Sequence, residues 1–194
     1  MRQPALTIRR WTRAEYDRLV DLGVLDREPV ELIGGQLMVA EPQGSYHSSR
    51  IGAAGDALRA ALPSGWLVRV QMPVALDDES EPEPDLAVVP GTWADYEAGH
   101  PSRPALVVEV AESSLVFDRA EKGSLYARAG IADYWILNLA DRVLEVYREP
   151  AHDSASPYGW RYLARELLGV AEVASPLAFP SVRVAVRALF GSST

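Results

Sequence analysis

Apolar residues follow two different spacings along the chain, and these spacings predict an alternation of strands and helices. Short runs that are continuously apolar, or that alternate with polar residues, predict strands at 66–72, 86–89, 105–111, 134–139 and 143–147. Apolar residues at helical spacing predict helices at 11–22, 45–62 and 118–129. Because no repeat or linker interrupts this alternation, we expect a single domain over residues 1–194.

Turn and cap residues add detail near the N-terminus. Thr12 and Glu15 have the spacing of a helix capping box, in which each side chain accepts a hydrogen bond from a backbone N–H of the other residue. Gly34 and Gly35 separate two apolar stretches, which predicts a β-hairpin over 30–39.

The C-terminal part of the chain is more broken in its pattern. A stretch rich in Pro, Gly and Ser at 150–159 predicts a loop. Two apolar stretches after it, at 160–163 and 166–173, predict a last pair of strands, and a short helix is expected within 180–190.

Composition excludes several classes of function. The chain of 194 residues has no cysteine, which rules out disulfides, Cys-ligated zinc, iron–sulfur clusters and a Cys nucleophile. Residues 1–11 lack the apolar core of a signal peptide, and no window approaches the ~20 apolar residues of a membrane span. We therefore expect a cytoplasmic protein that has no membrane partner.

The charge of the chain is acidic and unevenly distributed. The formal net charge is −8, and an acidic cluster lies between Asp77 and Asp85. A generic nucleic-acid-binding domain is basic, so this charge counts against binding DNA by electrostatic attraction alone. It counts less against a metal-dependent enzyme, because clustered carboxylates can recruit a cation.

Two residues, one within the apolar run at 105–111 and one after it, are candidates for a chemical role. Glu109 interrupts that run, and a buried carboxylate is costly unless a cation or hydrogen-bond donor accompanies it. Lys122, in the helix predicted next, is the only lysine of the chain; every other basic residue is arginine. A site that needs a compact ammonium would reject the planar guanidinium of arginine. The alternatives are chance and an ordinary helical ion pair between Lys122 and Asp118, four residues earlier.

Three acids lie in or beside predicted strands: Glu31, Asp85 and Glu109. If the strands at 86–89 and 105–111 pair, the carboxylates of Asp85 and Glu109 can converge on one cation, with the carbonyl oxygen of Val110 as a further ligand. Hard oxygen ligands suit Mg²⁺ or Mn²⁺ rather than zinc. Lys122 could reach in to hold an attacking water or a phosphate oxygen. Such a set favours metal-assisted hydrolysis of a phosphodiester.

A helix N-terminus favours anions, and the helix predicted at 45–62 carries His47 and Arg50 near its start. Either residue could contact a phosphate, and His47 could equally be an ordinary surface histidine. Glu31 could likewise be an exposed acid of the hairpin.

The motifs around these residues resemble the Uma-two family of restriction-type endonucleases, within the PD-(D/E)xK nuclease superfamily. The matching stretches are VELIGGQLMV, the segment from Pro42 to His47, PEPDLAVVP, ALVVEVAESS and DRAEKGSLYARAGIADYWILN. The resemblance implies an α/β fold with a restriction-endonuclease-like core: a mixed central sheet flanked by helices, with additional β-hairpins. It implies that Asp85 and Glu109 are metal ligands, that Lys122 is the catalytic lysine and that Glu31 is an additional active-site acid.

The chain departs from the superfamily pattern at two positions. The lysine normally lies two residues after the second acid, and that position is Ala111 here, so Lys122 has to reach the site from the helix. Glu112 also stands where a small or apolar residue is common, so the turn after Glu109 can differ.

Two functions of different classes follow from these observations. The first is a Mg²⁺-dependent or Mn²⁺-dependent endonuclease that acts on DNA, expected as a homodimer because cutting a duplex requires two sites. The second is a catalytically silent nuclease fold that serves as a binding or regulatory module of a mobile-element or defence system.

Overall fold

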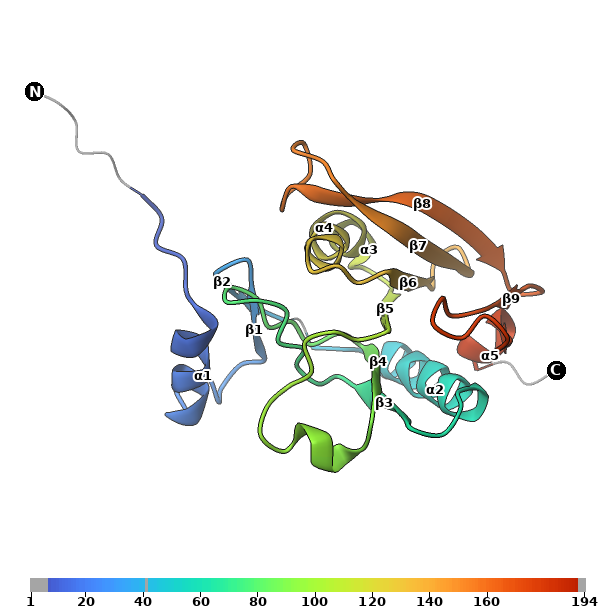
Figure 1. The fold of residues 1–194 in the computed structure, drawn as a ribbon, viewed down its shortest axis with the longest axis horizontal. Coiled ribbons are helices and arrows are strands. Elements are labelled where there is room, and N and C mark those ends of the chain that lie inside the picture. The colour runs from blue at the N-terminus through green and yellow to red at the C-terminus, as the bar shows by residue number, and fades with distance from the viewer. Residues whose placement is uncertain (1–6, 41, 192–194) are drawn as a thin grey trace, which may run out of the picture.

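A six-stranded mixed sheet forms the centre of the chain, in the strand order β3-β4-β5-β6-β7-β8 (Figure 1). The computed structural model describes residues 7–40 and 42–191. The strands of this sheet are β3 (Trp66–Val70), β4 (Leu86–Pro90), β5 (Leu106–Ala111), β6 (Asp133–Asn138), β7 (Val143–His152) and β8 (Trp160–Gly169). β5 and β6 run parallel, and the other neighbouring strands of the sheet run antiparallel. The mixed central sheet that the sequence predicted is therefore confirmed.

Helices cover both faces of this sheet (Figure 1). The helices and helical turns are α1 (Arg13–Asp21), α2 (Ser45–Ala61), η1 (Trp93–Tyr96), α3 (Leu115–Phe117), η2 (Asp118–Lys122), α4 (Gly123–Arg128) and α5 (Val186–Leu189). Side chains of a strand point alternately to the two faces. Val108 and Val110 of β5 accordingly join the core under α2, whereas Val107 and Ala111 join the core under α4. Glu109 therefore points toward the α4 side.

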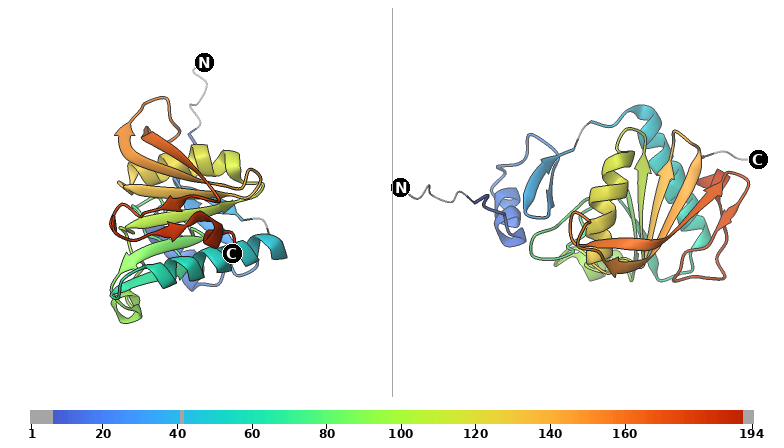
Figure 2. Two further views of the ribbon diagram at one scale, coloured as in Figure 1. Left: turned by 90° about the vertical axis from the view of Figure 1, so that its right-hand side faces the viewer. Right: turned by 90° about the horizontal axis from the view of Figure 1, so that it is seen from above.

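The β-hairpin of β1 (Val30–Ile33) and β2 (Gln36–Val39) lies with α1 at one end of the molecule (Figure 2). Gly34 and Gly35 form its turn with φ angles of 55° and 76°, which glycine adopts without steric cost. Backbone hydrogen bonds hold the hairpin against the acidic segment: the N–H of Gly35 donates to Glu79, and the N–H of Glu81 donates to Leu32. The predicted hairpin is confirmed, and it is separate from the central sheet.

The capping box predicted at the start of α1 is also confirmed. The backbone N–H of Glu15 donates to the Thr12 hydroxyl, and the backbone N–H of Thr12 donates to the Glu15 carboxylate, at 3.0 Å in the second case. The expectation that no signal peptide is present concerns residues 1–11, of which 1–6 lie outside the described part. Among residues 7–40 and 42–191, no helix combines the length and apolar character that crossing a membrane requires.

The prediction for the C-terminal strands was wrong. Stretches 160–163 and 166–173 are not two strands, because β8 runs without a break from Trp160 to Gly169 and pairs with an extended β7. Pro150, the start of the predicted loop, is paired with Tyr162 inside that ladder. The turn is confined to 153–159, where the Asp153 side chain accepts hydrogen bonds from the backbone N–H of Ala155 and the hydroxyl of Ser156.

A fully buried carboxylate, Glu145 of β7, joins the sheet to the helical turn η2. It accepts hydrogen bonds from the guanidinium groups of Arg119 and Arg165, from the Asn138 amide at 3.0 Å and from the Tyr147 hydroxyl at 2.6 Å. Burial alone raises the pKa of Glu145, but the hydrogen bonds from Arg119, Tyr147 and Asn138 outweigh it and hold the pKa at about 2, below its usual 4.5. The charged form of Glu145 therefore stabilises the fold.

We expect the substitution Glu145→Gln to lower the free energy of unfolding at pH 7 by about 1.5–3 kcal/mol, the range for hydrogen bonds to a charged group. Because the pKa of Glu145 is lowered in the folded state, its contribution is present above pH 4.5 and is lost as the pH falls toward 2. Urea unfolding at pH 7 and pH 3 checks this: the difference between wild type and variant should shrink at pH 3. The exposed Glu166→Gln in β8 is the matched control; equal stability of wild type and Glu145→Gln at pH 7 would contradict the prediction.

Candidate active site

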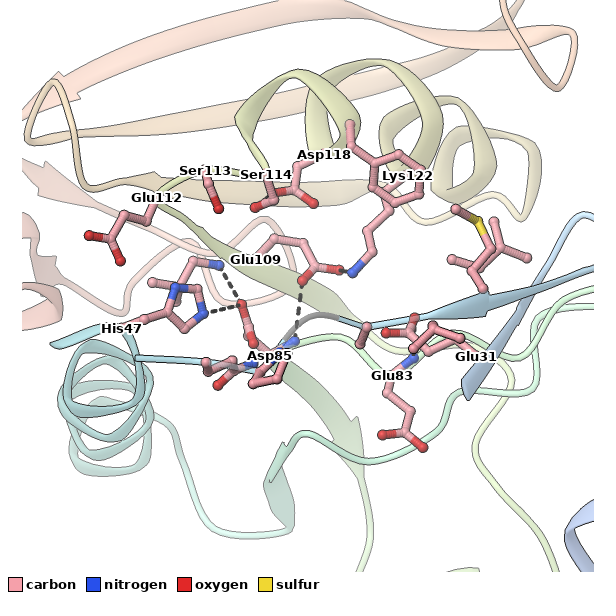
Figure 3. A pocket seen from close by; sticks show the side chains of 18 of the residues that line it. Glu31, His47, Glu83, Asp85, Glu109, Glu112, Ser113, Ser114, Asp118 and Lys122 are labelled. Atoms are coloured by element: carbon pink, nitrogen blue, oxygen red, sulfur yellow. Dashed lines mark hydrogen bonds and ion pairs between the residues drawn. The ribbon is translucent and has the colours of Figure 1, made fainter. Parts of the chain in front are cut away.

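Pairing of β4 with β5 brings the carboxylates of Asp85 and Glu109 together. Asp85 comes directly before β4, and the register opposes Leu86 to Val108. The backbone N–H of Asp85 donates to Oε2 of Glu109 at 3.3 Å, and the backbone N–H of Val110 donates to Oδ2 of Asp85 at 2.8 Å. The two acids thus sit at adjacent backbone positions of neighbouring strands, each fixed by an N–H of the other strand (Figure 3).

Lys122 reaches the same place from the helical segment that follows β5. Its Nζ lies 2.9 Å from Oε1 of Glu109 (Figure 3). The Lys122 side chain is only 11% exposed. The helix predicted at 118–129 is present, but it begins earlier, with α3, and contains a π-helical turn at Asp118–Lys122. π-helical turns are rare in proteins, and many of those that occur lie at functional sites. The ammonium of Lys122 therefore contacts the strand acid, and its hydrogen bond goes to Glu109 rather than to Asp118.

Tyr126, one helical turn after Lys122, completes the contacts of Glu109. Its hydroxyl donates to Oε1 of Glu109 at 2.7 Å, and the side chain is fully buried. Residues four apart lie on the same helix face, so Lys122 and Tyr126 approach the carboxylate together. Burial raises the pKa of Glu109 to about 8, although the Lys122 ammonium opposes this shift. The charged form of Glu109 therefore depends on the hydrogen bonds that Lys122 and Tyr126 donate to it.

Glu31 enters the site from the hairpin. It lies in β1 opposite Met38, and its Oε2 accepts a hydrogen bond from the backbone N–H of Glu83 at 3.1 Å. This bond joins β1 to the PEPD stretch that leads to Asp85. Figure 3 shows the Glu31 side chain on the side of the cavity nearer Lys122.

His47 and Arg50, both near the start of α2, have different surroundings. Nε2 of His47 lies 3.8 Å from Oδ2 of Asp85, and the interaction with Asp85 raises the pKa of His47 above its usual value. Arg50 does not line the cavity; its guanidinium donates to the carbonyl oxygen of Phe190 and lies 5.1 Å from the ring of Tyr46. The structure therefore brings His47 to the acids and directs Arg50 elsewhere.

These groups line a cavity of about 580 Å³. Its charged lining consists of the acids Glu31, Glu83, Asp85, Glu109, Glu112 and Asp118 together with Lys122 and His47. Sequence reasoning missed Glu83, Asp118 and Tyr126 as members of the site. Glu83 lies two residues before Asp85, and Asp118 and Tyr126 lie four residues on either side of Lys122, so helical spacing from the lysine was the available signal.

Asp118 is buried at the start of the π-helical turn. Its carboxylate accepts a hydrogen bond from the Ser114 hydroxyl at 2.5 Å, and burial raises its pKa despite the nearby Lys122. Burial alone lowers the pKa of Lys122, but the charges of Glu109, Glu31, Asp118 and Asp85 outweigh it and raise that pKa above its usual value. The lysine is held as an ammonium among carboxylates.

The donor set fits a hard divalent cation. Within the described residues, no three His, Asp or Glu side chains form a ready-made metal cage. Mg²⁺ does not need one, because it usually keeps several waters and binds through one or two carboxylates together with substrate phosphates. The carboxylates of Asp85 and Glu109 are adjacent, the carbonyl oxygen of Val110 follows directly, and the lining acids outnumber the cationic side chains. Added positive charge would therefore stabilise this cavity.

Comparisons with known proteins identify a family and a similar fold. Residues 13–187 match the model of the Uma2 family, which carries the description "Putative restriction endonuclease". Among solved structures, the fold is similar to the crystal structure of a putative nuclease belonging to DUF820 from Anabaena variabilis ATCC 29413. The TM-score is 0.59 at 16% sequence identity, over 84% of this chain and 89% of that chain. No curated protein matches the chain.

The structural likeness, at this low identity, concerns the fold alone, and it confirms the predicted restriction-endonuclease-like architecture. The family match covers far more than half of the sequence and includes every strand of the central sheet. The chain therefore belongs to the Uma2 family, as its motifs indicated.

Proposed function

We propose that this protein is a metal-dependent endonuclease that hydrolyses phosphodiester bonds of DNA with Mg²⁺ or Mn²⁺. The observation that carries the proposal is the meeting of Asp85, Glu109 and Lys122 in one acidic cavity, with Nζ of Lys122 2.9 Å from Glu109. Family membership supports the nuclease class. Asp85, Glu109 and the Val110 carbonyl would hold the cation, which supplies Lewis-acid polarisation of the phosphodiester and of the attacking water.

Lys122 acts in this proposal as a fixed donor of charge and hydrogen bonds. Its ammonium is surrounded by acids, which favour the protonated form, so it is suited to orienting a water or a non-bridging phosphate oxygen. An ammonium has three N–H donors, and one of those of Lys122 forms the hydrogen bond to Glu109. Glu31 borders the same cavity and adds negative charge on the hairpin side.

His47 has a position suited to the reaction rather than to the fold alone. Its ring lines the cavity, 3.8 Å from Oδ2 of Asp85, and it lies in the first turn of α2. A phosphate near Asp85 would meet both the imidazole and the N-terminal end of the helix. We propose His47 as a phosphate contact, and the proposal leaves out Arg50, because its guanidinium donates to the carbonyl oxygen of Phe190.

We expect Asp85→Asn and Lys122→Met each to lower metal-dependent cleavage of DNA by at least about 100-fold, the scale for losing a group that stabilises transition-state charge. Cleavage should also stop when EDTA removes the cation. Asp56→Asn, at an exposed position on α2, is the matched control and should retain full activity. Circular dichroism of each variant shows whether the fold survives.

Retention of full cleavage in both Asp85→Asn and Lys122→Met, with the fold intact, would contradict the proposal. The acid excess of the cavity also suits the second function, a nuclease fold that binds without cutting. Calorimetry separates the two: tight Mn²⁺ binding that Asp85→Asn abolishes supports the enzyme, and its absence together with absent cleavage supports the silent module.

Tyr126 is a positioning residue in this proposal, because it touches Glu109 and lines no part of the cavity. We expect Tyr126→Phe to weaken Mn²⁺ binding by about tenfold, as loss of a hydrogen bond that orients a ligand does. Titration calorimetry measures the change. Tyr134→Phe is the control, since that buried hydroxyl donates to the backbone carbonyl of Asp118 and not to Glu109. Equal weakening by both variants would indicate a general packing effect.

A further inference from the structure

The cavity has a second lining that the metal chemistry does not use. Apolar side chains of the hairpin, Ile33, Met38 and Val39, contribute to it, and Phe117 of α3 contributes from a different element. They surround the same hollow as Asp85 and Glu109, about 580 Å³ in volume. A volume of this size is within the range of about 300–1,000 Å³ typical of sites for small molecules.

Three of these residues, Met38, Val39 and Phe117, leave apolar surface open, whereas Ile33 is buried. Met38 and Phe117 are half-buried, and Val39 is 58% exposed. Among the described residues, neither Met38 nor Phe117 belongs to either of the two apolar clusters that pack against the sheet. Apolar side chains that line a cavity without joining a core are suited to covering an apolar ligand surface.

The charges around the cavity disfavour a bulky polyanion. Binding of a DNA duplex depends on many phosphate contacts from Lys and Arg. In the lining that the structure describes, Lys122 and His47 are the cationic side chains, and each already lies beside a carboxylate. The nearby arginines Arg50 and Arg119 are engaged with Phe190 and Glu145. A duplex therefore finds few free cations here, and affinity has to come from another source.

We propose that the cavity takes one unpaired nucleotide of single-stranded DNA, with its base against Met38 and Phe117 and its phosphate toward Asp85 and Glu109. Enzymes that admit a single nucleotide hold its base between aromatic or apolar side chains, and stacking supplies affinity without regard to sequence. In a duplex, the neighbouring bases cover both faces of each base, so Met38 and Phe117 could not contact them. The inference rests on the proposed nuclease function for the place of the phosphate, and it names single-stranded or locally unpaired DNA as the substrate class.

Binding and cleavage are measured on one labelled strand, alone and annealed to its complement. Binding uses the Lys122→Met protein with Mn²⁺, to prevent turnover, and fluorescence anisotropy; cleavage uses the wild type with Mn²⁺. We expect the single strand to bind at least tenfold more tightly than the duplex. Phe117→Ala and Met38→Ala, each in the binding background, should raise the Kd for the single strand by about tenfold, the scale of one lost stacking contact.

Two further variants keep this test sharp. Phe117→Leu retains apolar volume without the ring, so it should fold where Phe117→Ala does not and should still weaken binding of the single strand. Leu163→Ala removes an exposed apolar side chain of β8 outside the cavity and should leave the Kd unchanged. In the wild-type background, Phe117→Ala should raise KM for the single strand and change kcat by no more than about twofold.

The inference is overturned if the duplex binds as tightly as the single strand, or if the Phe117 and Met38 variants bind like wild type. In either case, metal-dependent cleavage of the duplex would leave the proposed function standing. Absence of cleavage of both substrates, with preferred binding of the single strand that depends on Phe117, would instead contradict the nuclease function and keep the nucleotide site.

Discussion

The ion pair between Glu109 and Lys122 is the interaction on which the site depends. Glu109 lies in a strand whose every residue is buried, and a lone carboxylate there would be strongly disfavoured. Three groups offset this cost: the ammonium of Lys122, the hydroxyl of Tyr126 and the backbone N–H of Asp85. Replacing such a set with apolar residues is often neutral or stabilising in other proteins, so burial of this pair is poorly explained by stability alone. The arrangement fits the proposed role of Glu109 as a metal ligand.

The topology decides which residues can take part. β5 and β6 are parallel, so the chain has to cross over between them, and the crossover carries α3, η2 and α4 over the face to which Glu109 points. A lysine on this crossover can reach Glu109 although it is far from the usual place for the lysine, two residues after the acid. Asp118 and Lys122, the first and last residues of the π-helical turn, are both buried, and Arg119 of the same turn donates to Glu145. If Lys122 has the catalytic role proposed for it, this crossover supplies the ammonium that Ala111 cannot.

Much of this arrangement follows from local sequence rules. The strand at 105–111, the glycine turn of the hairpin and the capping box at Thr12 each depend on residues close together in sequence, and each is present in the structure. The single lysine and the acid in the apolar run were visible for the same reason. Helical spacing places Asp118 and Tyr126 on the same face as Lys122, but which face meets the strand acids depends on the rotation of the helix over the sheet, and local sequence rules do not give that rotation.

The prediction of the C-terminal strands failed for a different reason. Composition at 150–159 favours a loop, yet Pro150 is tolerated inside the ladder, and β7 continues to His152. Long antiparallel pairing between β7 and β8 outweighs the local preference, and no rule that considers a few residues at a time contains that pairing. Arg50 illustrates the same limit: its position at the start of α2 favoured a phosphate contact, but the distant Phe190 carbonyl accepts its hydrogen bond.

The two linings of the cavity also bear on the expectation of a dimer. That expectation came from duplex cleavage, which requires two cuts and therefore two sites. A site that admits one unpaired nucleotide needs a single cut, and a single chain supplies all of its described parts: the acids of the central sheet, the ammonium of the crossover and the apolar side chains of the hairpin and α3. If the base is held as proposed, the chemistry no longer requires a dimer, and a monomer would be sufficient. The hairpin takes no part in the central sheet, but hydrogen bonds join it to the acidic segment. On this proposal, those bonds would hold the apolar lining at a fixed distance from the carboxylates.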